Sequence, residues 1–260
     1  MVHEIKPERL DTVSLHRAGG IFYYETLDST NSTAAQLAAA GAADGTVVVA
    51  EEQRRGRGRL GRGWDSAYAR GLYFSLLWRA DQRNPAGTAP ITLAAAVSTA
   101  AVLDAKTGLP VKIKWPNDLL LKGKKLGGIL AELKEGEKGG YLVIGIGLNI
   151  NQERADFRPE LREKACSLYT ARGRLHDRTA LLLALVERLR EDCRRFFASG
   201  FGPFRGKWIE FSDTLGKDVM LTTRGKTICG KALDLDEDGT LLIETESGTI
   251  CRINSGEIII

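Results

Sequence analysis

Residues that build metal sites and disulfide frameworks are scarce in this sequence. Its 260 residues include four cysteines and three isolated histidines, and no two cysteines form a C-x-x-C pair. The cysteines are Cys166, Cys193, Cys229 and Cys251. A zinc site built by the protein is therefore not supported, and neither is a Ser-His-Asp hydrolase, which needs a histidine base. Widely spaced cysteines are typical of the reducing cytoplasm, where we expect this protein.

Long hydrophobic runs are also absent. A membrane-spanning helix needs about 18 consecutive apolar residues, whereas even the stretch from Ile91 to Leu103 is broken by Ser98 and by threonines. The N-terminus shows no charged-then-apolar signal segment. We therefore expect no insertion into a membrane.

Positive charge is concentrated in one place. The net charge is +4, and the segment from Glu51 to Trp64 alone carries five positive and two negative charges. From Asp213 onward there is no Phe, Tyr or Trp on which nucleic-acid bases could stack. A local excess of cations favours a small anionic ligand over a long nucleic acid. A nucleic-acid-binding module that uses the same arginines is the alternative from a different class.

The apolar periodicity predicts a mixed α/β domain over residues 21–212, preceded by a short segment, 1–20, and followed by a small β-barrel over residues 213–260. Strands are expected at 21–25, 46–53, 71–78, 111–115, 118–121, 125–133 and 141–150, and in the tail at 217–223, 227–235, 240–245, 249–253 and 257–260. Helices are expected from Ser29, Thr30 or Asn31 to Gly41, over 89–106 and over 179–198. Asp177 is expected to cap the last helix, and a bridging segment surrounds Trp208.

The segment from Glu51 to Trp64 contains five arginines and four glycines between two apolar strands. Glycine lets backbone N–H groups approach a ligand closely, and guanidinium groups match phosphate or carboxylate oxygens two at a time. The spacing Gly56-x-Gly58-x-x-Gly61 resembles a dinucleotide fingerprint, but no helix follows directly, and the H-R-D and D-F-G motifs of kinases are missing. We interpret the segment as an anion-binding loop of another kind.

Two further stretches insert polar groups and glycines into apolar strands. The first runs from Lys114 to Gly128, and the second is Ile144-Gly145-Ile146-Gly147-Leu148-Asn149-Ile150-Asn151. Turn chemistry explains the Pro-Asn-Asp sequence in the first stretch but not Lys125. A lysine followed by two glycines in a strand indicates a point charge aimed at a ligand that lies against bare backbone. Asn149 could hydrogen-bond a base or sugar, or simply a turn.

Five motifs resemble those of the biotin protein ligase family, in the family's order. They are Ser29-Thr30-Asn31, Gln53 with Gly56 to Trp64, Lys114-Trp115-Pro116-Asn117-Asp118, Lys125-Leu126-Gly127-Gly128 and Gly145-Ile146-Gly147-Leu148-Asn149. One glycine pattern is weak evidence, whereas five ordered motifs are specific. The resemblance covers residues 21–260 and implies a mixed-sheet catalytic domain with a C-terminal SH3-like β-barrel. It also implies an ATP-dependent ligase that makes biotinyl-5′-adenylate and then biotinylates a lysine of a biotin carboxyl carrier protein, as in acetyl-CoA carboxylase.

The resemblance also implies roles for particular residues, with Arg59 and Lys125 as the catalytic pair. The biotin side would comprise Ser29, Thr30, Asn31, Gln53, Arg57, Gly58, Arg59, Lys125, Gly127 and Gly128. The nucleotide side would comprise Gly56, Arg59, Arg62, Trp64, Asn117, Asp118, Lys125 and Asn149. Magnesium would arrive with ATP, and no metal site built by the protein is expected.

The sequence departs from the bifunctional members of the family in two places. Those members carry a DNA-binding winged helix before the catalytic domain, whereas only residues 1–20 precede it here, so repressor activity is not supported and the monofunctional type is expected. Leu60 occupies a position often held by another arginine. A lipoate-type protein ligase remains an alternative within the same reaction class, and side-by-side pairing of exposed strand edges into a homodimer is left open.

Overall fold

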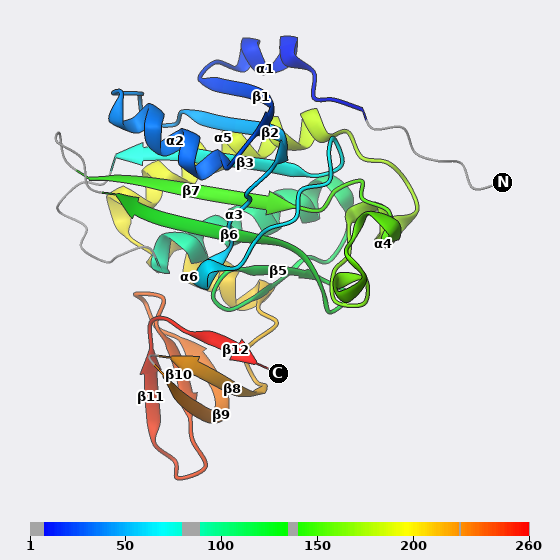
Figure 1. The fold of residues 1–260 in the computed structure, drawn as a ribbon. Coiled ribbons are helices and arrows are strands. Elements are labelled where there is room, and N and C mark those ends of the chain that lie inside the picture. Colours follow the sequence, from blue (N-terminus) through cyan, green and yellow to red (C-terminus); the bar gives the residue numbers. More distant parts are fainter. Residues whose placement is uncertain (1–7, 80–88, 135–139, 224, 260) are drawn as a thin grey trace.

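The computed structural model describes residues 8–79, 89–134, 140–223 and 225–259, and Figure 1 shows them as a large and a small β-sheet with helices around the large one. Residues 1–7 of the expected N-terminal segment lie outside the described residues. The large sheet has the strand order β1-β2-β3-β7-β6-β5-β4. Its strands are β1 (Ile21–Leu27), β2 (Val47–Gln53), β3 (Leu72–Arg79), β4 (Lys112–Lys114), β5 (Asp118–Leu121), β6 (Lys124–Lys134) and β7 (Tyr141–Leu148). The β1 and β2 strands are parallel and the other neighbours antiparallel, so the sheet is mixed, as predicted.

Helices cover both faces of the large sheet. On one face, Val48 packs in a small apolar cluster with residues of α2 (Thr30–Ala39). Its neighbours Val47 and Val49 point to the other face and join the main core, together with α3 (Ala89–Thr107) and α5 (Arg178–Ser199). Figure 1 shows α2 in front of the sheet and α3 and α5 behind it. Coverage on both faces explains why β2 is apolar at consecutive positions.

The α3 helix carries no charged side chain before Asp104 and is largely buried up to Leu103. By length and composition it could cross a membrane, although Ser98 and threonines break its run of apolar residues. Ser98 and Thr99 interrupt the run, but their hydroxyls donate to the carbonyls of Ala94 and Ala95 one turn earlier. The window that passes the test is 67% buried inside the protein, and α3 packs against α5, as the core helix of a globular domain does.

The ends of α5 follow the predicted chemistry. The Asp177 side chain accepts a hydrogen bond from the N–H of Ala180 at 2.9 Å, and Gly200 at the C-cap has φ 70°. Three helices were not predicted: α1 (Thr12–Ala18), α4 (Leu168–Arg172) and α6 (Gly202–Phe211). The first two are too short to show a helical period. For α6 the signal was present, because Pro203 lies in the first turn, a position that favours proline.

The C-terminal strands form a five-stranded antiparallel sheet in the order β11-β10-β9-β8-β12. They are β8 (Asp218–Thr223), β9 (Lys226–Leu235), β10 (Leu241–Glu244), β11 (Ile250–Ile253) and β12 (Glu257–Ile259). The expected closed barrel is not seen in the described part of the chain, where β11 and β12 remain the two edges. These edge strands have four and three residues, so they offer few backbone groups for closing the sheet.

The small sheet is packed against the end of the large domain. The N–H of Trp115 donates to the Thr214 hydroxyl at 2.9 Å, and Arg205 forms an ion pair with Asp234 at 2.6 Å. One apolar core runs through both parts. The expected domain boundary after residue 212 falls at the C-cap of α6, and the division into domains stays a prediction.

Candidate functional site

The arginine–glycine loop between β2 and β3 is folded into a narrow turn. The N–H of Gly58 donates to the carbonyl of Arg62 at 2.7 Å, and the N–H of Trp64 donates to the carbonyl of Gly56 at 2.9 Å. At the tip, Leu60 has the left-handed backbone (φ 55°) and its side chain is exposed. A Cβ on Gly56 would lie 2.4 Å from the Trp64 carbonyl oxygen, so only glycine fits where the two arms meet.

A buried ion pair fixes the end of β2 from which this loop starts. The Glu51 carboxylate is fully buried and lies 2.8 Å from Nη1 of Arg178, at the start of α5. It also accepts the backbone N–H of Leu10 at 2.6 Å and lies 3.3 Å from the Tyr23 hydroxyl. Burial, and secondarily this carboxylate, raise the pKa of Tyr23 to about 12. The loop therefore begins from a rigid anchor.

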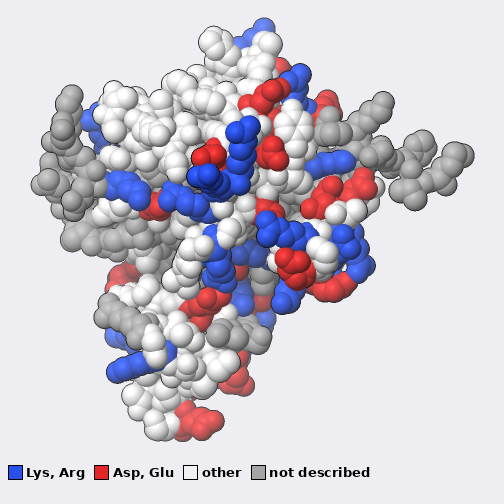
Figure 2. Space-filling model, viewed as in Figure 1, with Lys and Arg blue, Asp and Glu red and all other residues white. Residues whose placement is uncertain are grey.

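The three central arginines of the loop point to different partners. Arg57 donates to Glu132 on β6 at 2.8 Å, whereas Arg62 pairs with Glu257 on β12 at 2.5 Å. Arg59 bridges the two sheets, because Nη1 donates to the Asn117 side chain at 3.1 Å and Nη2 to the Gly256 carbonyl at 3.0 Å. Burial lowers the pKa of Arg59. In Figure 2, Lys and Arg side chains gather near the centre of this face.

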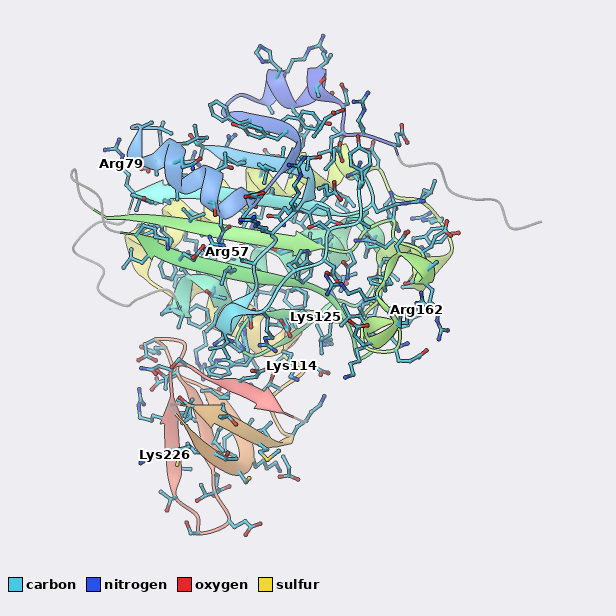
Figure 3. The ribbon with its side chains drawn as sticks, in the orientation of Figure 1. Arg57, Arg79, Lys114, Lys125, Arg162 and Lys226 are labelled. Atoms are coloured by element: carbon cyan, nitrogen blue, oxygen red, sulfur yellow. The ribbon has the colours of Figure 1, made fainter. Side chains whose placement is uncertain are left out.

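Lys125 and Arg59 are held by two residues that are adjacent in the chain, Asp118 and Asn117. Lys125 Nζ lies 2.7 Å from Oδ1 of Asp118 and 5.8 Å from the centre of the Trp64 ring. Its backbone is fixed on both sides, since its N–H donates to the Lys164 carbonyl and its carbonyl accepts from Cys166. Figure 3 shows Arg57 and Lys125 over the large sheet. The structure thus brings the two expected catalytic residues together.

The Ser29-Thr30-Asn31 motif forms a buried polar cluster at the start of α2. All three residues are buried, and Gln53 accepts from both the N–H and the hydroxyl of Thr30, at 2.9 and 3.1 Å. Both polar atoms of the Asn31 side chain bond other residues of the protein. Its amide nitrogen donates to Glu132 at 2.8 Å, and its oxygen accepts from Ser75 at 2.6 Å. Ser29 is the N-cap of α2, but its hydroxyl makes no capping bond.

Glycines on β6 and β7 form a floor under these side chains. A Cβ on Gly145 would lie 2.1 Å from Oδ1 of Asn31, and one on Gly147 would lie 2.6 Å from the Trp64 ring. At Gly128 the nearest atoms, from Asp118, Lys125 and Trp64, are all 3.6 Å away. A Cβ on Gly127, which was also expected at the site, would instead meet the Leu148 side chain. The glycines let polar side chains and an aromatic ring lie against bare backbone.

Asn149 lies in the interior and supports the site from behind. Its amide nitrogen donates to the Cys166 carbonyl at 3.0 Å, and its oxygen accepts from Gln152 at 3.1 Å. These bonds favour the turn-forming role over the base-binding role that the sequence left open. Its assignment to the nucleotide side stays a prediction.

Sequence reasoning missed three residues that hold the site in place. The Glu132 carboxylate accepts hydrogen bonds from both Asn31 and Arg57. The fully buried Ser75 hydroxyl lies within hydrogen-bond distance of Thr30 and Asn31. The Glu257 carboxylate accepts from Arg62. A signal existed for Ser75 and Glu132, since each is polar within a largely apolar strand, and a buried polar group needs a partner. Nothing local pointed to Glu257, because its partner lies in the other sheet.

The comparisons with known proteins agree with this geometry. A model of the biotin/lipoate A/B protein ligase family matches residues 23–149, and one of the biotin protein ligase C terminal domain matches residues 214–260. The bifunctional ligase/repressor BirA of Bacillus subtilis is 38% identical over 242 residues, covering 92% of this chain and 73% of that protein. The biotin--[acetyl-CoA-carboxylase] ligase of Mycobacterium tuberculosis is 31% identical over 241 residues, covering 89% of this chain and 85% of that protein.

Solved structures give the same result. The biotin protein ligase from Aquifex aeolicus in complex with biotin and ATP superimposes with a TM-score of 0.80 and 35% identity, over 92% of this chain and 97% of that one. The fold shared with that ligase therefore includes both sheets of this chain. From these matches, the chain belongs to the biotin protein ligase family.

Proposed function

We propose that this biotin ligase, whose substrates are biotin and ATP, works in two steps. The biotin carboxylate attacks the α-phosphate of ATP and displaces pyrophosphate, giving biotinyl-5′-adenylate. The amine of a lysine on a biotin carboxyl carrier protein then attacks the acyl carbon and displaces AMP. The observation that carries the proposal is that Arg59 and Lys125 bond the adjacent residues Asn117 and Asp118, and that Lys125 and Asp118 lie at Gly128.

The two cations suit the first step because it brings a carboxylate and a triphosphate together. Fixed positive groups lower the repulsion between these anions and stabilise the charge that develops on the α-phosphate. Arg59 is partly buried and tied to both sheets, so it is already oriented before substrates bind. Lys125 would exchange part of its contact with Asp118 for the reacting oxygens.

Magnesium would bind through the phosphates of ATP and neutralise part of their charge. Mg²⁺ in phosphate-transfer sites is held by one or two carboxylates together with the phosphates. Asp118 is a partly exposed carboxylate next to Lys125, so the residues present fit such an ion.

The polar cluster at the start of α2 suits the ureido ring of biotin. The buried hydroxyl of Ser29 would hydrogen-bond the ring, while Asn31, whose amide is already engaged, would hold the cluster in shape. A ligand lacking the ureido group would leave the buried Ser29 hydroxyl without that bond, which disfavours analogues. The match to a biotin-specific C-terminal domain also supports biotin over lipoate.

Glu132 provides a first test of this arrangement. Glu132→Ala removes the acceptor shared by Asn31 and Arg57, and an unsatisfied buried donor costs about 1–3 kcal/mol. We expect the KM for biotin to rise about tenfold or more, with a smaller change in kcat. Glu132→Gln keeps an acceptor oxygen and should recover most of the loss. Steady-state rates with biotin varied at saturating ATP measure both, and an unchanged KM in the alanine variant would contradict the role of Glu132.

Gly147→Ala tests the contact between the glycine floor and Trp64. The new methyl group would overlap the Trp64 ring, and overpacking costs about 1–3 kcal/mol. We expect the KM for ATP to rise about tenfold while biotin binding changes less. Gly206→Ala is the matched control, because a Cβ there, in α6, meets nothing within 4 Å. Equal KM values for ATP in the two variants would argue against Trp64 on the nucleotide side.

The function itself is tested by mass spectrometry of an acceptor. The chain, ATP, Mg²⁺ and biotin are incubated with a biotin carboxyl carrier domain, and the carrier should gain the mass of one biotin on one lysine. A carrier whose target lysine is replaced by arginine is the control and should gain nothing. If lipoate rather than biotin raised the melting temperature and modified an acceptor, the lipoate-type alternative would hold. The cytoplasmic location and the oligomeric state stay predictions.

A further inference from the structure

A second cationic pocket lies at the tip of the β5–β6 hairpin. Its volume is about 310 Å³, within the lower range of small-molecule sites. Four of its lining side chains are cations, namely Lys122, Lys124, Arg154 and Arg162, and its lining residues include no Asp or Glu. Its floor is apolar and includes the buried side chains of Leu121, Phe157 and Cys166.

This charge excess is not a general property of hollows on this protein. Another pocket, of about 480 Å³, is lined by cations and acids in equal number: Arg9, Arg70 and Arg178 with Glu8, Asp11 and Asp177. Its lining therefore carries no excess of either sign. The cations of the smaller pocket have no acid in its lining to balance them, and an anionic ligand would supply that negative charge.

The cations of the smaller pocket are held by few neighbours. Glu163 is largely exposed and pairs with both Lys124, at 3.4 Å, and Arg154. Lys122 donates to the Ala171 carbonyl at 3.2 Å, and Nε of Arg162 donates to the Phe157 carbonyl at 3.1 Å. These carbonyl bonds fix the side chains without removing their charge. Of the four cations, Lys124 and Arg154 therefore share one exposed carboxylate, whereas Lys122 and Arg162 are held by backbone carbonyls.

The pocket is separate from the Lys125 site but shares a wall with it. Lys124 and Lys125 are adjacent on β6, and strand alternation directs them to opposite faces, toward Glu163 and Asp118 respectively. The backbone of Lys125 pairs with residues 164–166, which belong to the segment that carries Arg162 and Cys166. In Figure 3, Arg162 lies to the right of Lys125, near α4.

We propose that this pocket binds a small organic phosphate at a site distinct from the biotin and ATP site. The phosphate would lie among the four cations, where two guanidinium groups can each donate to two of its oxygens. The apolar part of the ligand would cover Leu121, Phe157 and Cys166. The volume suits a molecule with one ring and one phosphate.

Titration calorimetry at low salt tests this, with phenyl phosphate as the probe and inorganic phosphate as the comparison. The full chain should bind phenyl phosphate at least about fivefold more tightly than inorganic phosphate, because only the former covers the floor. The Arg154→Ala/Arg162→Ala variant should lose about tenfold or more in affinity for phenyl phosphate. The matched control, Lys207→Ala/Arg252→Ala, removes the same charge from exposed positions elsewhere and should bind within about twofold of the original chain.

Two outcomes would overturn the proposal. Equal loss in both double variants would mean that phenyl phosphate responds only to net charge, and equal affinity for both probes would leave only an inorganic anion site. Biotin titrated into the same samples shows whether each variant is folded and whether its biotin site is intact, independently of phenyl phosphate. Hydrogen exchange adds a measurement without mutation: phenyl phosphate should slow exchange in residues 154–166 of the original chain, and unchanged exchange would count against binding there.

Discussion

Lys125→Ala is expected to slow biotin-dependent pyrophosphate release by about a hundredfold or more while weakening biotin binding by less than about tenfold. The reason is geometric. Lys125 Nζ lies 2.7 Å from Asp118 and on the same side of the site as Arg59, where the two anions must meet. Its charge is needed most when negative charge develops on the α-phosphate. Rapid-quench measurement of pyrophosphate, together with biotin calorimetry, separates rate from binding.

Removing Lys125 also leaves Asp118 without its ion-pair partner, so part of the loss would come from a carboxylate that repels the phosphates. The double variant Lys125→Ala/Asp118→Asn should therefore recover up to about tenfold of the rate. Lys164→Ala is the matched control, because this exposed lysine contributes only its carbonyl to the Lys125 backbone. Equal losses of rate and binding in Lys125→Ala would mean that Lys125 merely binds biotin.

The sequence was sufficient for the elements whose signals are local. The strands of both sheets and helices α2, α3 and α5 follow from apolar periodicity, and the Asp177 cap and the Gly200 end follow from side-chain chemistry that acts within one turn. The short helices α1 and α4 were not predicted because one or two turns show no helical period, although Asp11 and Ser167 cap them through local side-chain bonds. A closed barrel was expected but is not seen in the described residues. Closure requires pairing between β11 and β12, which local sequence patterns do not report.

The residues of the candidate site also fall into those with a local sequence signal and those without one. Glycine patterns predicted where side chains lie against bare backbone, and Gly145 and Gly147 show this most clearly. The partners of the arginines were not predictable, because Glu132 and Glu257 are 75 and 195 residues away from Arg57 and Arg62 along the chain. The resemblance assigned Arg57 to the biotin side, Arg62 to the nucleotide side and Arg59 to both. The structure directs Arg57 to the Asn31 end, Arg62 to β12 and Arg59 to Asn117, and the assignment of each arginine to a ligand stays a prediction.

Arg59→Gly is expected to release the adenylate about a hundredfold faster than the original chain. Arg59 is the link through which the loop holds both Asn117 and the Gly256 carbonyl, and hydrogen bonds from a charged donor contribute about 1.5–3 kcal/mol each. Without them the loop loses one of its contacts with the small sheet and keeps the Arg62–Glu257 pair, and the phosphate of the adenylate loses a cation. The intermediate should then escape and acylate lysines of unrelated proteins. Filter-binding of preformed radiolabelled adenylate measures its release, and labelling of a bystander protein measures its escape.

Arg57→Gly is the matched control, with the same change two residues earlier in the loop. Arg57 is tied to Glu132 at the Asn31 end rather than to Asn117 or the small sheet, so its loss should raise the KM for biotin and leave the release of the adenylate nearly unchanged. The two variants differ only in which end of the ligand loses its arginine. Two results would contradict this assignment: Arg59→Gly retains the adenylate as the original chain does, or both variants release it equally fast. Arg59 would then have no separate role in retaining the intermediate.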